Sequence, residues 1–273
     1  MKVDNDGVQI SYEVHGQGRP VLLLHGFPDS GRVWRHQVPA LTAAGFQVIV
    51  PDMRGYGESD QPPEVDAYGG FALATDVVAI MDDQGIDRAH IVGHDWGAAV
   101  AWVLGSFFPD RVDHLVTMSV GHPATFHGGG FDQYEKSWYM LLFQFPDIAE
   151  QWLTENDWAR FRAWGHHPDA AGVIADLERT GSLTPGLNWY RANMKPESFV
   201  GAPFPFPKVA APTLGIWSSE DHALTEGQMT RSAELVEGPW TYRRLDGPGH
   251  WMQLEDPDAI NALLLGFLPS GSN

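Results

Sequence analysis

Residues 91–99 place a carboxylate where an enzyme could form a covalent bond. A buried strand leads into a sharp turn between Gly93 and Gly97, and a helix rich in small residues follows. Such a turn presents its middle residue, here Asp95, as a nucleophile. A carboxylate suits displacement at a saturated carbon and would leave an alkyl ester on the protein, whereas a serine attacks a carbonyl. The alternative is that Asp95 only caps the following helix, since Asp is a favoured N-cap residue.

An alkyl ester on Asp95 must later be hydrolysed, and that step needs further residues. A base must activate water, and another group must orient the base. Asp221 follows one strand-like run, and His250 follows the next, after a glycine-proline-glycine turn. We therefore predict Asp95 as nucleophile, His250 as base and Asp221 as the acid that orients it. Glu220 is the alternative acid, because it adjoins Asp221.

Ester hydrolysis also develops negative charge on oxygen, which backbone N–H groups can stabilise. Two amides are suitably placed in the sequence. One belongs to Trp96, directly after the nucleophile, and the other to Phe27, in the loop at residues 25–28. The positive end of the helix that begins near Trp96 would also favour an anion at this point. The alternative for residues 25–28 is a simple tight turn.

Short apolar runs predict the elements that must hold these residues. An alternating segment at 8–14 predicts a half-buried strand, and continuous runs predict buried strands at 20–24, 46–50, 89–92, 115–120, 213–217 and 241–245. Helical periodicity predicts helices at 34–44, 71–84, 97–108 and 257–267. Alternating strands and helices indicate a parallel sheet covered on both faces. Every predicted core site residue follows such a strand, at the edge where active sites of these sheets lie.

This alternation stops near Gly121. Residues 131–193 have helical periodicity and many aromatic side chains, and a proline-rich stretch follows before strand-like runs resume. This pattern predicts a sheet core, residues 1–121 and 206–273, interrupted by a helical cap, residues 122–205.

The composition excludes several classes of partner. The 17 basic and 35 acidic side chains give a net charge of −18, which would repel nucleic acid and anionic membranes. Cysteine is absent, so disulfides and thiolate metal sites are excluded. The sequence has no recognisable signal peptide and no apolar run long enough to span a bilayer. These features favour a cytoplasmic protein.

The chain resembles the α/β-hydrolase fold epoxide hydrolases. Within this family it is close to the soluble epoxide hydrolases, and it is related to the haloalkane dehalogenases. The core segments that carry the resemblance are His25-Gly26-Phe27-Pro28, Arg54-Gly55-Tyr56-Gly57-Glu58-Ser59, Gly93-His94-Asp95-Trp96-Gly97 and Gly249-His250-Trp251. The resemblance extends over nearly the whole chain. It implies an α/β fold with a mostly parallel eight-stranded sheet, flanking helices and an inserted helical cap.

The resemblance also implies two catalytic tyrosines in the cap. Leu187-Asn188-Trp189-Tyr190-Arg191 resembles the segment that carries one of them, and Tyr139-Met140-Leu141-Leu142-Phe143-Gln144 resembles the segment that carries the other. Tyr134 is the alternative for the second. Opening an epoxide produces an alkoxide, a poor leaving group until it is protonated, and two phenols could hold and protonate that oxygen. The expected function is therefore hydrolysis of an epoxide to a vicinal diol.

Haloalkane dehalogenation by the same core is the alternative function, and three departures count against it. Phe27 stands where those relatives usually have an asparagine for the halide. Trp96 stands where the enzymes that act on fluoroacetate carry an arginine. The segment after residues 115–120 has no nearby carboxylate to replace Asp221. A ligand-binding protein on a hydrolase scaffold is the third hypothesis, and it is disfavoured because every catalytic position is filled.

The expected partner is a small apolar or aromatic epoxide, and the many aromatic residues of the cap support this. No metal or organic cofactor is implied. The adjacent pair His166 and His167 is a weak metal signal and is better explained as a loop before a helix. The sequence leaves open whether the chain forms a homodimer.

Overall fold

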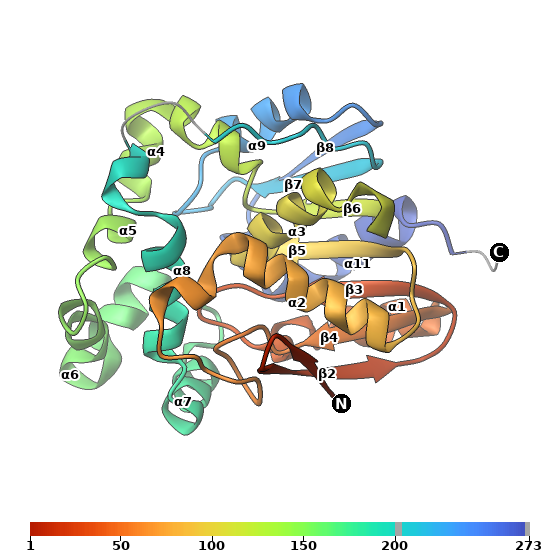
Figure 1. Cartoon of the computed structure of the whole chain (residues 1–273). Helices are drawn as coiled ribbons and strands as arrows, with labels where there is room; N and C mark the ends of the chain where they lie inside the picture. Colours follow the sequence, from red (N-terminus) through yellow and green to blue (C-terminus); the bar gives the residue numbers. More distant parts are fainter. Residues whose placement is uncertain (200–203, 271–273) are drawn as a thin grey trace.

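The computed structural model describes residues 1–199 and 204–270, and an eight-stranded sheet forms its centre (Figure 1). The strands lie in the order β1-β2-β4-β3-β5-β6-β7-β8. Their bounds are β1 (Lys2–Asn5), β2 (Val8–His15), β3 (Arg19–Leu24), β4 (Phe46–Pro51), β5 (Ala89–His94), β6 (Val112–Met118), β7 (Thr213–Ser218) and β8 (Trp240–Leu245). The pairings β1–β2 and β2–β4 are antiparallel, and all other pairings are parallel. The predicted mostly parallel sheet of eight strands is confirmed.

The central strands carry apolar side chains toward both faces, because helices cover the sheet on each side. Strands β5 and β7 are buried along their whole length. Their register matters for function, since Leu24 pairs with Gly93 and His94 pairs with Met118. The residues that follow β3, β5 and β6 therefore emerge at the same edge of the sheet.

Two layers of core helices enclose the sheet. Helices α2 (Gly70–Asp83) and α3 (Trp96–Phe107) contribute to one hydrophobic cluster. Helices α1 (Gln37–Ala43) and α11 (Pro257–Phe267) contribute to a second cluster. Shorter core elements are η1 (Gly31–Trp34), η2 (Val65–Tyr68), η3 (Pro109–Arg111), α9 (Glu226–Arg231), η7 (Ser232–Leu235) and α10 (Met252–Glu255).

The chain between β6 and β7 forms a separate group of helices, which we call the cap helices: α4 (Gly130–Lys136), α5 (Tyr139–Leu142), α6 (Ile148–Gly165), α7 (Ala170–Thr180) and α8 (Leu183–Asn193). Figure 1 shows them gathered together beyond one end of the sheet. The short turns η4 (Pro123–Thr125), η5 (His127–Gly129) and η6 (Pro196–Phe199) flank them. Residues 200–203 of the predicted cap lie outside the described residues, and the division into core and cap remains a prediction.

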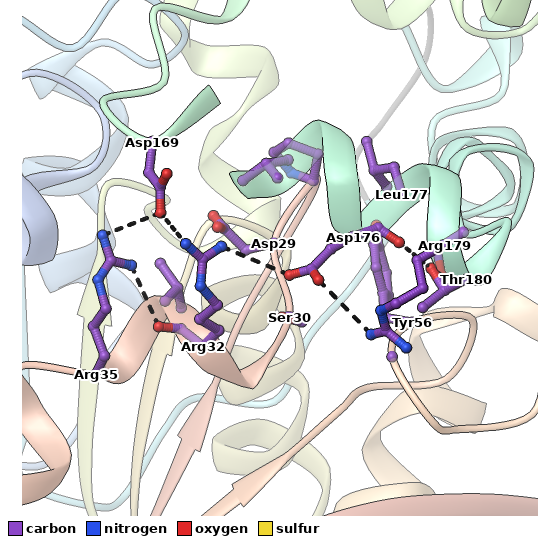
Figure 2. Close-up of a pocket in the computed structure, with 15 residues that line it drawn as sticks. Asp29, Ser30, Arg32, Arg35, Tyr56, Asp169, Asp176, Leu177, Arg179 and Thr180 are labelled. Atoms are coloured by element: carbon purple, nitrogen blue, oxygen red, sulfur yellow. Dashed lines mark hydrogen bonds and ion pairs between the residues drawn. The ribbon is translucent and has the colours of Figure 1, made fainter. Parts of the chain in front are cut away.

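Charged side chains join the cap helices to the core loop that follows β3. Figure 2 shows Arg32 of η1 and Arg35, which follows it, facing Asp169 and Asp176, at the start and in the middle of α7. Arg32 pairs with both carboxylates, and Arg35 lies 3.4 Å from Asp169. These side chains are partly exposed, so each pair contributes at most about 1 kcal/mol. The crevice between them encloses only about 20 Å³ and is therefore too small for a substrate.

Two differences from the predicted elements have physical reasons. Strand β1 has no buried residue, so no hydrophobic pattern marked it. Strand β6 begins at Val112 and ends at Met118, whereas residues 115–120 were predicted, because Asp113 and His114 interrupt its apolar start. Among the described residues, no helix is long and apolar enough to cross a membrane.

Candidate active site

Asp95 sits in a strained turn at the end of β5. Its φ and ψ are 53° and −125°, a conformation that a non-glycine residue adopts at a cost of about 1–3 kcal/mol. Gly93 and Gly97 permit the turn, since a Cβ at Gly93 would lie 2.2 Å from the Gly97 oxygen. A Cβ at Gly97 would lie 2.1 Å from the Leu24 oxygen. The turn holds the buried Asp95 carboxylate at the edge of the sheet, and no hydrogen bond from its side chain caps α3.

In the structure, the imidazole of His250 lies between the carboxylates of Asp95 and Asp221. His250 Nε2 lies 3.4 Å from Asp95 Oδ2, and His250 Nδ1 lies 3.1 Å from Asp221 Oδ2. The backbone N–H groups of Ala223 and Leu224 donate to Asp221 Oδ1 at 2.8 and 3.0 Å. Backbone N–H groups therefore hold Oδ1 of Asp221, and Oδ2 faces the imidazole of His250.

Electrostatics favour a charged imidazole while Asp95 is ionised. Burial alone would lower the pKa of His250, but the carboxylates of Asp221 and Asp95 outweigh burial and raise this pKa to about 10. Burial would likewise raise the pKa of Asp221, yet His250 and the hydrogen bond from Ser119 hold it well below its usual range. If Asp95 became a neutral ester, one of the two anions that favour imidazolium would disappear, and His250 could act as a base.

Ser119 is a member of this cluster that sequence reasoning missed. Its hydroxyl lies 2.5 Å from Asp221 Oδ2 and 2.9 Å from His250 Nδ1, at a buried position just after β6. The hydroxyl can donate to the carboxylate and accept from the imidazole. The signal in the sequence is a small polar residue near the end of the strand predicted at 115–120, and β6 in fact ends at Met118, just before it. We infer that Ser119 is a positioning residue for His250.

Replacing Ser119 should slow only the step in which His250 acts. Ser119→Ala is expected to lower kcat about tenfold, the effect of losing one hydrogen bond to a charged group. Because slower ester hydrolysis lowers kcat and KM together, kcat/KM should stay within about twofold. Ser119→Gly, which suits the φ of 69° at this position, is the matched control and should behave alike. A fall in kcat/KM equal to the fall in kcat would show that Ser119 acts elsewhere.

The loop at residues 25–28 reaches the nucleophile. The Phe27 N–H donates to Asp95 Oδ1 at 2.8 Å. Gly26 allows this approach, since a Cβ there would lie 2.2 Å from Asp95 Oδ1 and 2.6 Å from the Trp96 amide nitrogen. Within the described part of the chain, the Phe27 amide donates a hydrogen bond to the Asp95 carboxylate, and the Trp96 amide does not. One of the two predicted amides thus bonds the carboxylate, which leaves Oδ2 free toward His250.

Tyr139 and Tyr190, from α5 and α8, pack together beside Asp95. Their ring centroids are 6.0 Å apart, and the Tyr190 ring lies 5.1 Å from that of Trp96. Burial and the charge of Asp95 raise the pKa of both phenols well above 10, although a hydrogen bond with Tyr190 partly offsets this for Tyr139. Both phenols therefore remain protonated at neutral pH and can donate to an oxygen.

The alternative residues lie in other surroundings. Glu220 is exposed, and its carboxylate accepts from Ser219 at 3.3 Å. Tyr134 packs its ring 6.2 Å from that of Phe126. These placements favour Asp221 and Tyr139 for the predicted roles.

The pair His166 and His167 directly follows α6, and His166 is exposed whereas His167 is buried. Its Nδ1 accepts from the Asp169 N–H at 2.9 Å, so Nε2 carries the proton and donates to Asp29 at 3.1 Å. The other oxygen of Asp29 accepts from the Trp251 indole at 2.9 Å. The buried Asp29 thereby links the segment between α6 and α7 to Trp251, the residue that follows His250.

An apolar cavity of about 590 Å³ leads to Asp95. Trp96 and Tyr190 line it near the carboxylate, whereas Phe71 and Phe204, which are 57% and 65% exposed, lie at its mouth. The other lining side chains are largely aliphatic or aromatic, with Asn193 and Gln228 as exceptions. Such a cavity suits an apolar substrate with a few polar atoms.

Comparisons with known proteins agree with this geometry. A family model described as the alpha/beta hydrolase fold matches residues 19–257. Epoxide hydrolase A of Mycobacterium tuberculosis is 34% identical over 312 aligned positions, which cover 97% of this chain and 96% of that protein. The AB hydrolase superfamily protein YfhM of Bacillus subtilis is 32% identical, over 97% of this chain and 96% of that one.

Solved structures show the same relationship. A structure described as one of the novel epoxide hydrolases in metagenomes from hot environments has a TM-score of 0.87 and 31% identity, over 99% of this chain and 98% of that one. The Bacillus megaterium epoxide hydrolase in complex with an inhibitor has a TM-score of 0.89 and 26% identity, over 98% of this chain and 99% of that one. The chain therefore belongs to the α/β-hydrolase fold family, in the group that contains the epoxide hydrolases.

Proposed function

We propose that the chain hydrolyses an epoxide to a vicinal diol through a covalent ester on Asp95. The observation that carries this proposal is a buried carboxylate and a protonated phenol, Tyr190, in one apolar cavity, with a second protonated phenol, Tyr139, packed against Tyr190. A carboxylate can displace at carbon, and phenols can protonate the alkoxide that displacement releases. The names of the relatives support the same reaction.

In the first step, the epoxide lies in the apolar cavity with its oxygen toward Tyr190 and the adjacent Tyr139. Asp95 Oδ2 attacks an epoxide carbon, because Oδ1 is held by the Phe27 N–H. The new carbon–oxygen bond forms as the epoxide carbon–oxygen bond breaks. The released oxygen takes a proton from a phenol, which gives a hydroxyalkyl ester.

In the second step, His250 becomes the base. Esterification removes the charge of Asp95, so the pKa of His250 falls and the imidazole can accept a proton from water. Water attacks the carboxyl carbon of Asp95, and the Phe27 N–H stabilises the developing oxyanion. The ester bond then breaks, one water proton passes through His250 to the departing alkoxide, and the other restores the phenol.

This mechanism assigns Asp221 and Ser119 to the orientation of His250. It requires that the diol oxygen bonded to the attacked carbon comes from Asp95, and that Asp95 regains an oxygen from water. No step requires a metal or an organic cofactor. The substrate class proposed from the cavity is an apolar or aromatic epoxide.

A direct assay of product chemistry tests the proposed function. Purified protein is incubated with styrene oxide and, separately, with 1-bromobutane, and diol and bromide are measured by chromatography. We expect diol from the epoxide and no bromide above the uncatalysed rate. Bromide release without diol would support the dehalogenase alternative and overturn the proposal.

A further inference from the structure

Asp95 lines the apolar cavity together with Trp96 and Tyr190. That cavity extends from Asp95 along α3 and α2, past Val100 and Val103, to the aromatic mouth at Phe71 and Phe204. An epoxide ring placed at Asp95 can therefore extend one substituent along this cavity. A substituent on the other ring carbon must find space elsewhere.

A compact group of rings packs around Phe27 and Tyr139, near the nucleophile. Phe27, whose amide binds Asp95, lies 5.8 Å from Phe143 and 6.4 Å from Trp164 between ring centroids. Trp164 also packs 4.8 Å from Tyr139 and 5.3 Å from Phe143. Phe143 and Tyr139 are buried, so these rings form a wall beside the catalytic residues. None of Phe27, Phe143, Tyr139 and Trp164 lines the apolar cavity.

A second hollow adjoins this wall at Trp164. It is an open groove of about 800 Å³ that is lined by tryptophans and by charged and polar side chains. His222 also lines the groove, and its ring lies 5.8 Å from that of His250. One ring, that of His222, therefore separates the groove from His250, and one ring, that of Trp164, separates it from Tyr139. Trp164 thus belongs both to the groove and to the aromatic wall.

We propose that Trp164 is a specificity-determining residue that restricts the chain to epoxides with one large apolar substituent. This proposal rests on the proposed epoxide hydrolysis. A monosubstituted epoxide fits because its single substituent occupies the apolar cavity. A trans-disubstituted epoxide directs its second substituent at the aromatic wall, where Trp164 lies between the groove and the rings of Phe27 and Tyr139.

The size of the effect follows from close packing. Protein interiors have few voids, and a rigid wall rejects even a small additional group. One methylene in a pocket typically changes discrimination by about 10- to 200-fold. We therefore expect kcat/KM to fall about tenfold or more when a methyl replaces hydrogen on the second carbon, and further when a phenyl does so.

The test uses three substrates that share one phenyl arm: styrene oxide, trans-β-methylstyrene oxide and trans-stilbene oxide. For wild type, kcat/KM for diol formation should fall in this order, with trans-stilbene oxide about a hundredfold below styrene oxide. Trp164→Ala should raise the ratio of kcat/KM for stilbene oxide to that for styrene oxide at least tenfold, because the groove would then extend to the rings of Phe27 and Tyr139. Trp164→Phe should give an intermediate ratio and guards against misfolding of the alanine variant.

Trp152→Ala is the matched control, since Trp152 lies in α6 before the kink at residues 155–158 and packs against Trp138 and Arg160 rather than against the wall. Its substrate ratio should equal that of wild type. The proposed role of Trp164 would be overturned if wild type hydrolysed all three epoxides at similar rates, or if both folded Trp164 variants kept the wild-type ratio of stilbene oxide to styrene oxide. Neither result would overturn the proposed epoxide hydrolysis. Absence of diol from every epoxide with every variant would overturn the proposed function and this inference with it.

Discussion

His250→Gln is expected to convert the protein into one that stops after the first chemical step. The variant should form the ester on Asp95 and then fail to hydrolyse it, because glutamine cannot accept a proton from water. Loss of general base catalysis should lower kcat about a hundredfold to ten-thousandfold. Intact-mass spectrometry should show one substrate mass added per chain, and peptide analysis should place it on Asp95.

The control for this result is His222→Gln, the same chemical change at a ring 5.8 Å from His250. It should show no persistent adduct. A folded His250→Gln variant that gives no adduct, with a substrate that wild type turns over, would contradict the role of His250. Equal accumulation in His222→Gln would contradict the assignment of the base.

The double variant Tyr139→Phe/Tyr190→Phe should lose most epoxide opening. Each phenol is neutral, buried and close to Asp95, so each can donate one hydrogen bond to the departing oxygen. Removal of both should slow formation of the ester about a hundredfold to ten-thousandfold, with each single variant less affected. Rapid-quench measurement of ester formation under single-turnover conditions isolates this step from hydrolysis.

Tyr134→Phe is the matched control for the phenols, since Tyr134 packs against Phe126. Its rate of ester formation should stay within about threefold of wild type. If the double variant opened styrene oxide at the wild-type rate, the phenols would have no role as acids. If Tyr134→Phe were the slow variant, the second donor would be Tyr134 rather than Tyr139.

The site could largely be predicted because its residues follow strands that the sequence marks clearly. Gly93, Asp95 and Gly97 define the turn after β5, and Asp221 and His250 follow the last two strands of the sheet. Parallel strands carry such positions to one edge, so distant residues meet without further information. The tyrosines differ, because only the resemblance, and no local pattern, indicated which cap residues matter.

The remaining features depend on packing between distant parts of the chain. The hydroxyl of Ser119 meets Asp221 across 102 residues, and nothing around Ser119 announces that contact. The packing of Trp164 against Phe27 and Tyr139 depends on how α5, α6 and the loop at residues 25–28 come together. The edge strand β1 is not predicted by the hydrophobic pattern, because it is held by pairing with β2 and buries none of its side chains fully.

The origin of one diol oxygen tests the covalent step directly. Enzyme in excess over styrene oxide is mixed in water enriched in oxygen-18, and the first-turnover diol and the protein are analysed by mass spectrometry. The proposed mechanism predicts unlabelled diol and one heavy oxygen in the peptide that contains Asp95. Labelled diol from the first turnover, with an unlabelled Asp95, would mean that water attacks the epoxide itself and would contradict the account.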